Sequence, residues 1–125
     1  MTLKKESSLH TKIRKFAERR GHYVIKIWGG GFQEAGIPDL ILCVNGIFIG
    51  MEVKIDDGKP SALQVDHVLS ITEAGGIGCI VWTFEEAMEI INWAEDYSLT
   101  KNVDGGIKLQ YLDKANELYD KYTKG

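Results

Sequence analysis

The stretch from Ile37 to Lys54 constrains the fold of this chain more than any other. Two runs of β-branched and aliphatic residues flank Asn45-Gly46. Asn-Gly between such runs is typical of a β-hairpin with a two-residue type I′ turn, because both turn residues take positive φ. The turn also fixes the register of the two strands, and we expect Val44 to face Ile47.

In this register Asp39 lies directly opposite Glu52, as a non-hydrogen-bonded pair whose Cα atoms are about 4.5 Å apart. Like charges so close repel each other, but Mg²⁺ is held by one or two carboxylates together with phosphate oxygens and water. Lys54 lies two residues beyond Glu52 and shares its face of the strand. A surface salt bridge is the alternative. We favour a ligand site, because such charges at one end of buried strands are costly without a ligand.

The opposite face of the hairpin is apolar throughout, and we expect it to be core. It carries Leu40, Leu42, Val44, Ile47, Ile49, Met51 and Val53. Near the turn, Ile41, Cys43 and Phe48 make the other face apolar too, so we expect central strands covered on both sides. Cys43 and Cys79 are expected to be buried free thiols. A bulge at Gly50 would shift the pairing.

The first part of the chain is basic. Apolar spacing predicts a helix from Lys4 to Arg20, ended by Gly21. Residues 1–26 carry eight Lys or Arg and two acidic residues, a net charge of +6, which leaves −9 for the remainder. This asymmetry suggests one face for a phosphate backbone, although a solvated amphipathic helix is the alternative. The candidate DNA contacts are Lys12, Lys15, Arg19 and Lys26.

Other elements follow from local signals. Two capping boxes, Ser61–Gln64 and Thr83–Glu86, each open a predicted helix. The further predicted elements are a strand at His22–Trp28, a loop at Gly29–Gly36, a strand at Gly78–Trp82, a helix reaching about Asp96 and a helical segment at Leu112–Tyr122. The loop lacks a phosphate-binding P-loop ending, so no nucleotide cofactor is expected.

At Pro38-Asp39 and Glu52-Val53-Lys54 the chain resembles the PD-(D/E)XK nuclease superfamily. Between about Glu6 and Trp82 it is similar to the VRR-NUC branch, which includes small phage and bacterial nucleases. The residues that carry this resemblance are Glu6, Gly36 to Leu40, Glu52 to Lys54, Gly58-Lys59 and Gln64.

The resemblance implies an α/β fold with a restriction-endonuclease-like αβββαβ core, in which helices flank a mixed central sheet. We expect this nuclease domain at residues 1–97 and a C-terminal helical extension at residues 98–125. The extension would pack on the core or between subunits. A parallel crossover is expected at the helix that Ser61 opens.

The resemblance also implies hydrolysis of DNA phosphodiesters with Mg²⁺ or Mn²⁺. Asp39, Glu52, Glu6 and the Val53 carbonyl would hold the ion, and Lys54 would orient or deprotonate the attacking water. Glu6 has the alternative of a surface acid favoured by the helix dipole. Gln64 would point toward the metal or the scissile phosphate, although the capping box explains it equally well.

Small members of this branch suggest branched DNA such as four-way junctions as substrate and a homodimer as the assembly. They also suggest a phage or mobile-element origin. A chain of 125 residues with 44% hydrophobic content suits one domain. It shows no membrane span or signal peptide, so we expect a cytoplasmic protein. The alternatives are a restriction-type or general duplex endonuclease, a DNA-binding module, and an unrelated hairpin domain that binds Ca²⁺ or a protein.

Overall fold

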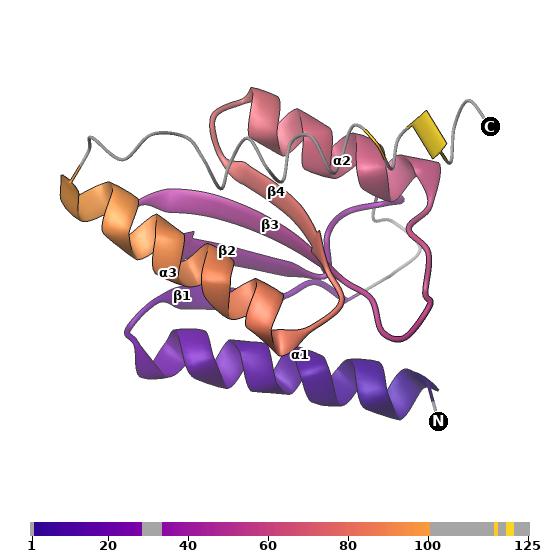
Figure 1. Cartoon of the computed structure of the whole chain (residues 1–125), viewed down its shortest axis with the longest axis horizontal. Helices are drawn as coiled ribbons and strands as arrows, with labels where there is room; N and C mark the ends of the chain where they lie inside the picture. Colours follow the sequence, from indigo (N-terminus) through magenta and orange to yellow (C-terminus); the bar gives the residue numbers. More distant parts are fainter. Residues whose placement is uncertain (1, 29–33, 101–116, 118–119, 122–125) are drawn as a thin grey trace.

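A four-stranded sheet lies between two helix layers, with α1 and α3 on one face and α2 on the other (Figure 1). The computed structural model describes residues 2–28, 34–100, 117 and 120–121. In chain order the elements are α1 (Thr2–Arg19), β1 (Tyr23–Lys26), β2 (Leu40–Val44), β3 (Ile47–Val53), α2 (Ala62–Glu73), β4 (Ile77–Val81) and α3 (Phe84–Thr100). This order confirms the predicted αβββαβ core.

The sheet is mixed, as predicted. Its strand order is β1-β2-β3-β4, with antiparallel pairing from β1 to β3 and parallel pairing between β3 and β4. The crossover between the parallel strands is α2, which Ser61 opens with the predicted capping box. Strand β1 is shorter than the predicted strand, and α3 continues beyond Asp96 to Thr100.

The β2–β3 hairpin has the predicted register. Val44 pairs with Ile47, and the pairing continues without interruption to Leu40 and Met51. The turn residues Asn45 and Gly46 have φ values of 50° and 88°, as a type I′ turn requires. Because Gly50 keeps its place in the ladder, the hairpin has no bulge there.

Gly50 and Gly78 allow α2 to pack closely against the sheet. The two glycines are paired neighbours on β3 and β4. A Cβ atom at Gly78 would lie 1.9 Å from the Val68 carbonyl oxygen, and one at Gly50 would lie 2.4 Å from Cδ1 of Ile71. The backbone of α2 therefore rests directly on β4, at a distance that a side chain on the strand would not permit.

The core lies between the sheet and the α1–α3 layer. Six of the seven residues predicted for the core face of the hairpin are buried, and Ile47 is half-buried. Side chains from α1 and α3 complete this cluster, and they include Ile13, Ala17, Ile90 and Ile91.

The predicted coverage of the other sheet face was wrong near the hairpin turn. Cys43 is exposed and Phe48 is 47% exposed. The cause is geometric: α2 packs on β3 and β4 but leaves uncovered β2 at Cys43 and the first residues of β3 at Phe48, next to the turn. Tyr23, Ile25, Cys43 and Phe48 form an uncharged patch on this face, termed the open sheet patch below. Cys79 is buried as predicted.

Only part of the predicted C-terminal segment falls within the described structure. Residues 117, 120 and 121 are helical and exposed, and the rest of Leu112–Tyr122 lies outside the described residues. The division into residues 1–97 and 98–125 stays a prediction. Among the described helices, none is long and apolar enough to cross a membrane.

Candidate functional site

Side chains from the hairpin and from two helices meet at the open end of the β2–β3 hairpin. Asp39 immediately precedes β2, and Glu52 lies near the end of β3. Glu6 and His10 come from the first turns of α1, and Gln64 from the first turn of α2. The hairpin register thus brings the two carboxylates together, and the two helices approach them from opposite layers.

The Asp39 carboxylate is fixed by contacts to both the sheet and α1. Its Oδ2 atom accepts a hydrogen bond from the Val53 backbone N–H at 3.0 Å and lies 3.4 Å from His10 Nε2. Burial alone would raise the pKa of Asp39, but His10, the Val53 N–H and Glu52 lower it below its ordinary value. Asp39 is therefore the ionised member of the carboxylate pair.

Glu52 is the most deeply buried acid of the site, at 2% exposure. Its Oε2 atom accepts a hydrogen bond from Gln64 Nε2 at 3.1 Å and lies 3.5 Å from Lys54 Nζ. Its Oε1 atom is buried and has no hydrogen-bond partner among the described residues. Burial and the charge of Asp39 raise the pKa of Glu52 from 4.5 to about 8, although Lys54 opposes the shift.

Glu6, His10 and Asp39 form a group with the spacing of metal ligands. One ligand atom from each lies within 4.8 Å of the others. His10 is 5% exposed, and neither ring nitrogen makes a hydrogen bond among the described residues. Sequence reasoning missed His10. The signal was its position four residues after Glu6 and three before buried Ile13, on the same helical stripe.

Gln64 forms the predicted capping box and also contacts a carboxylate of the candidate site, while its role toward a metal or phosphate stays a prediction. Its side chain accepts a hydrogen bond from the Ser61 backbone N–H at 2.8 Å, and its own N–H donates to Ser61 Oγ at 3.1 Å. The amide nitrogen of the same side chain donates to Glu52. The capping box therefore holds Gln64 in the orientation that reaches the carboxylate.

The basic residues predicted to contact DNA lie along α1 and β1. Lys12, Lys15 and Arg19 line a groove of about 270 Å³, together with Phe16, Arg20 and Phe84. Lys12 Nζ lies 4.4 Å from the centroid of the Phe84 ring. Lys26 lies apart from this groove, with Nζ 4.4 Å from the centroid of the Trp28 ring.

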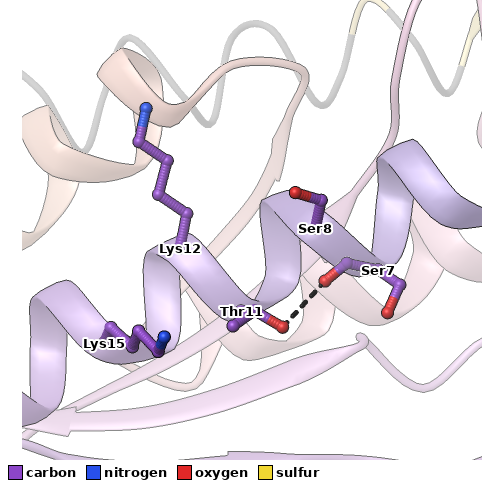
Figure 2. A pocket seen from close by; sticks show the side chains of 5 residues that line it. All are labelled: Ser7, Ser8, Thr11, Lys12 and Lys15. Atoms are coloured by element: carbon purple, nitrogen blue, oxygen red, sulfur yellow. Dashed lines mark hydrogen bonds between the residues drawn. The ribbon is translucent and has the colours of Figure 1, made fainter.

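A second hollow adjoins this groove and shares Lys12 and Lys15 with it. Ser7, Ser8 and Thr11 are its other described lining residues. Figure 2 shows that these side chains come from successive turns of α1, and that the Thr11 hydroxyl donates to the Ser7 carbonyl oxygen. Hydroxyl and ammonium donors thus follow one another along the helix, beginning one residue after Glu6.

Among the comparisons with known proteins, the matches to solved structures agree with this architecture. No protein-family model and no curated protein matches the chain. A solved structure described as a VRR_NUC domain aligns with 70% of this chain and 95% of its own, at 24% identity and a TM-score of 0.60. Archaeoglobus fulgidus Hjc, a Holliday junction resolvase from an archaeal hyperthermophile, aligns with 62% of this chain and 67% of its own, at 16% identity and a TM-score of 0.50. The chain therefore has the fold of a VRR_NUC domain, a fold of the PD-(D/E)XK nuclease type.

Proposed function

We propose that this protein is a metal-dependent endodeoxyribonuclease that cuts branched DNA. The observation that carries the proposal is the Asp39–Glu52 pair, in which the buried Oε1 atom of Glu52 has no hydrogen-bond partner in the described part of the chain and the pKa of Asp39 is lowered by His10, the Val53 N–H and Glu52. Such an arrangement is costly unless a ligand compensates the charge. It supports a cation at the open end of the hairpin.

The donor set fits Mg²⁺ or Mn²⁺. Both ions prefer carboxylate and carbonyl oxygens, which Asp39, Glu52, Glu6 and the Val53 carbonyl would supply. His10 is placed to bind the ion directly or to fix the Asp39 carboxylate through their 3.4 Å contact. When bound, the ion would acidify a water molecule and stabilise negative charge on the phosphoryl oxygens.

Lys54 and Gln64 would act on the groups around the ion. Lys54 Nζ lies 3.5 Å from Glu52. As an ammonium it would orient the attacking water and offset the charge of the phosphate, and as a neutral amine it would take the proton of that water. Gln64 donates to the Glu52 oxygen that Lys54 also approaches. It is therefore a positioning residue, which holds the Glu52 carboxylate through its Oε2 atom.

The two roles of Gln64 can be separated by comparing Gln64→Ala with Ser61→Ala. Both variants break the capping box, so each should lower the free energy of unfolding by about 0.5–2 kcal/mol. Only Gln64→Ala also frees the Glu52 carboxylate, and it should lower the cleavage rate about 10- to 100-fold, as expected for loss of a group that orients a metal ligand. Equal cleavage rates in the two variants would leave Gln64 with the capping role alone.

DNA would approach along α1. The groove and the adjoining hollow place Lys12, Lys15 and Arg19 on one surface, and hydroxyl and ammonium donors of this kind contact phosphates. This surface begins beside Glu6, so a strand whose phosphate lies at the carboxylates could continue along the helix. Lys26 would contact the backbone on the other side of the site.

Cutting two strands of a junction calls for two active sites, and we propose a homodimer formed through the open sheet patch. The patch is apolar and uncharged, so a two-fold axis through it brings no like charges together. The wild-type protein should have about twice the 14.0 kDa mass of one chain in light scattering after gel filtration. Phe48→Glu should return it to the mass of one chain, whereas Tyr97→Glu, at an exposed aromatic outside the patch, should not. A dimer that persists in Phe48→Glu would place the interface elsewhere.

The test of function is cleavage of a labelled four-way junction and of a linear duplex with the same sequence, in Mg²⁺, Mn²⁺ or EDTA. Paired nicks in the junction that require the metal would support the proposal. Cleavage of the duplex alone would favour a general or restriction-type endonuclease. Binding of the junction without cleavage under any metal condition would favour a DNA-binding module.

A further inference from the structure

The Trp28 ring is the most exposed large apolar side chain in the described part of the molecule, at 72%. The other two tryptophans have partners. The Trp82 indole N–H donates to the Gly58 carbonyl at 2.9 Å, and Trp93 stacks on Tyr97 with ring centroids 5.0 Å apart. An exposed indole of this kind leaves a large apolar surface in water, which is unfavourable for the isolated protein.

Trp28 lies at the edge of the candidate site. The backbone N–H of Ile27 donates to the Asp39 carbonyl at 2.8 Å, so Trp28 follows a residue whose backbone is paired with that of a site carboxylate. A second exposed apolar side chain, Leu63 at 54%, neighbours Gln64 on the other side of the site.

The ammonium group of Lys26 packs against the Trp28 ring. Lys26 Nζ lies over one face of the ring, 4.4 Å from the centroid. An aromatic ring with an adjacent cation matches a nucleotide, because the ring can stack on the base while the ammonium contacts the phosphate. Stacking needs a base whose face is accessible. The interior of a continuous duplex offers no such face, but a branch point or an unpaired segment does.

We propose that Trp28 is a stacking site for a nucleobase exposed beside the scissile phosphate, with Lys26 contacting the adjoining phosphate. The inference rests on the proposed function and deepens it, because it names the DNA feature that the site recognises. Trp28 would favour DNA in which the pairing is interrupted next to the cut.

The inference can be tested by binding alone, with EDTA present so that metal-dependent cleavage cannot occur. Fluorescence anisotropy would compare a forked duplex, which ends in two unpaired arms, with a fully paired duplex of the same length. Trp28→Ala should weaken binding of the fork about 5- to 100-fold, the usual effect of losing one stacked base, and change binding of the paired duplex less than about twofold. Trp28→Phe, which keeps an aromatic ring, should recover most of the affinity.

The matched control is Tyr97→Ala, which removes an exposed aromatic ring from α3, and it should leave both affinities unchanged. Thermal unfolding of Trp28→Ala would show that the fold is intact. Unchanged binding of the fork, or equal loss on the fork and the paired duplex, would overturn the stacking site and leave the nuclease proposal in place. If the wild-type protein binds neither DNA, the proposed function fails and the stacking site with it.

Discussion

Replacing Asp39 with asparagine is expected to lower the rate of metal-dependent DNA cleavage at least about 100-fold, because loss of a group one step removed from a metal already costs about 10- to 100-fold. Asparagine has nearly the same shape as aspartate and can still accept the Val53 N–H bond. The fold should therefore persist. Initial rates on the four-way junction, with circular dichroism to check the fold, would measure the effect.

Asp56→Asn is the matched control for this substitution. Asp56 is exposed and pairs with Lys5 at 3.6 Å, outside the carboxylate group. Its φ of 50° is a conformation that asparagine also adopts readily. This variant should cleave within about twofold of the wild-type rate, since an exposed ion pair contributes little. Wild-type cleavage by Asp39→Asn itself would remove the carboxylate pair from the mechanism.

The second large effect is on stability, and it comes from Glu52. In the metal-free protein the pKa of Glu52 is raised to about 8, from an ordinary value of 4.5 that we take for the unfolded chain. The folded state then binds more protons between these two values, so the free energy of unfolding falls as the pH rises through this window. The slope should reach up to about 1.4 kcal/mol per pH unit. Urea unfolding in EDTA from pH 5 to pH 8 would measure it.

Glu52→Gln provides the internal control, because glutamine does not titrate. This variant should lose most of the slope and be more stable than the wild type at pH 8, while losing cleavage. Saturating Mg²⁺ should stabilise the wild type most at pH 8, where Glu52 deprotonates most easily, by about 2.7 kcal/mol at 100 times the dissociation constant. A wild-type slope that matches that of Glu52→Gln would show that Glu52 is ionised in the metal-free protein.

The parts of this structure that the sequence predicted are those set by local chemistry. Asn45-Gly46 permits one tight turn, and that turn set the register that reaches Leu40 and Met51, the neighbours of Asp39 and Glu52. The Thr83 capping box forms as predicted, with Glu86 N–H donating to Thr83 Oγ1 at 3.1 Å. In each case a few adjacent residues determine the geometry, so it can be predicted without knowledge of the rest of the fold.

The errors arose where a distant element decides the outcome. Cys43 and Phe48 have the apolar character of covered strand residues, but coverage depends on the width of α2 and on which strands it crosses. His10 was missed for a related reason. Its place on the buried stripe is visible in the sequence, but its contact with Asp39 depends on how α1 crosses the end of the sheet.

The close packing of α2 on Gly50 and Gly78 also limits how far Gln64 can lie from the Glu52 carboxylate. Val68, whose carbonyl faces Gly78, lies one helical turn after Gln64, and both lie on the side of α2 toward the sheet. A methyl group at Gly78 would lift the helix by roughly 1 Å or more, because its nearest neighbour is rigid backbone. The 3.1 Å bond from Gln64 to Glu52 would then exceed the reach of a hydrogen bond. Gly78 therefore controls the distance between the Gln64 side chain and the Glu52 carboxylate, although it lies outside the candidate site.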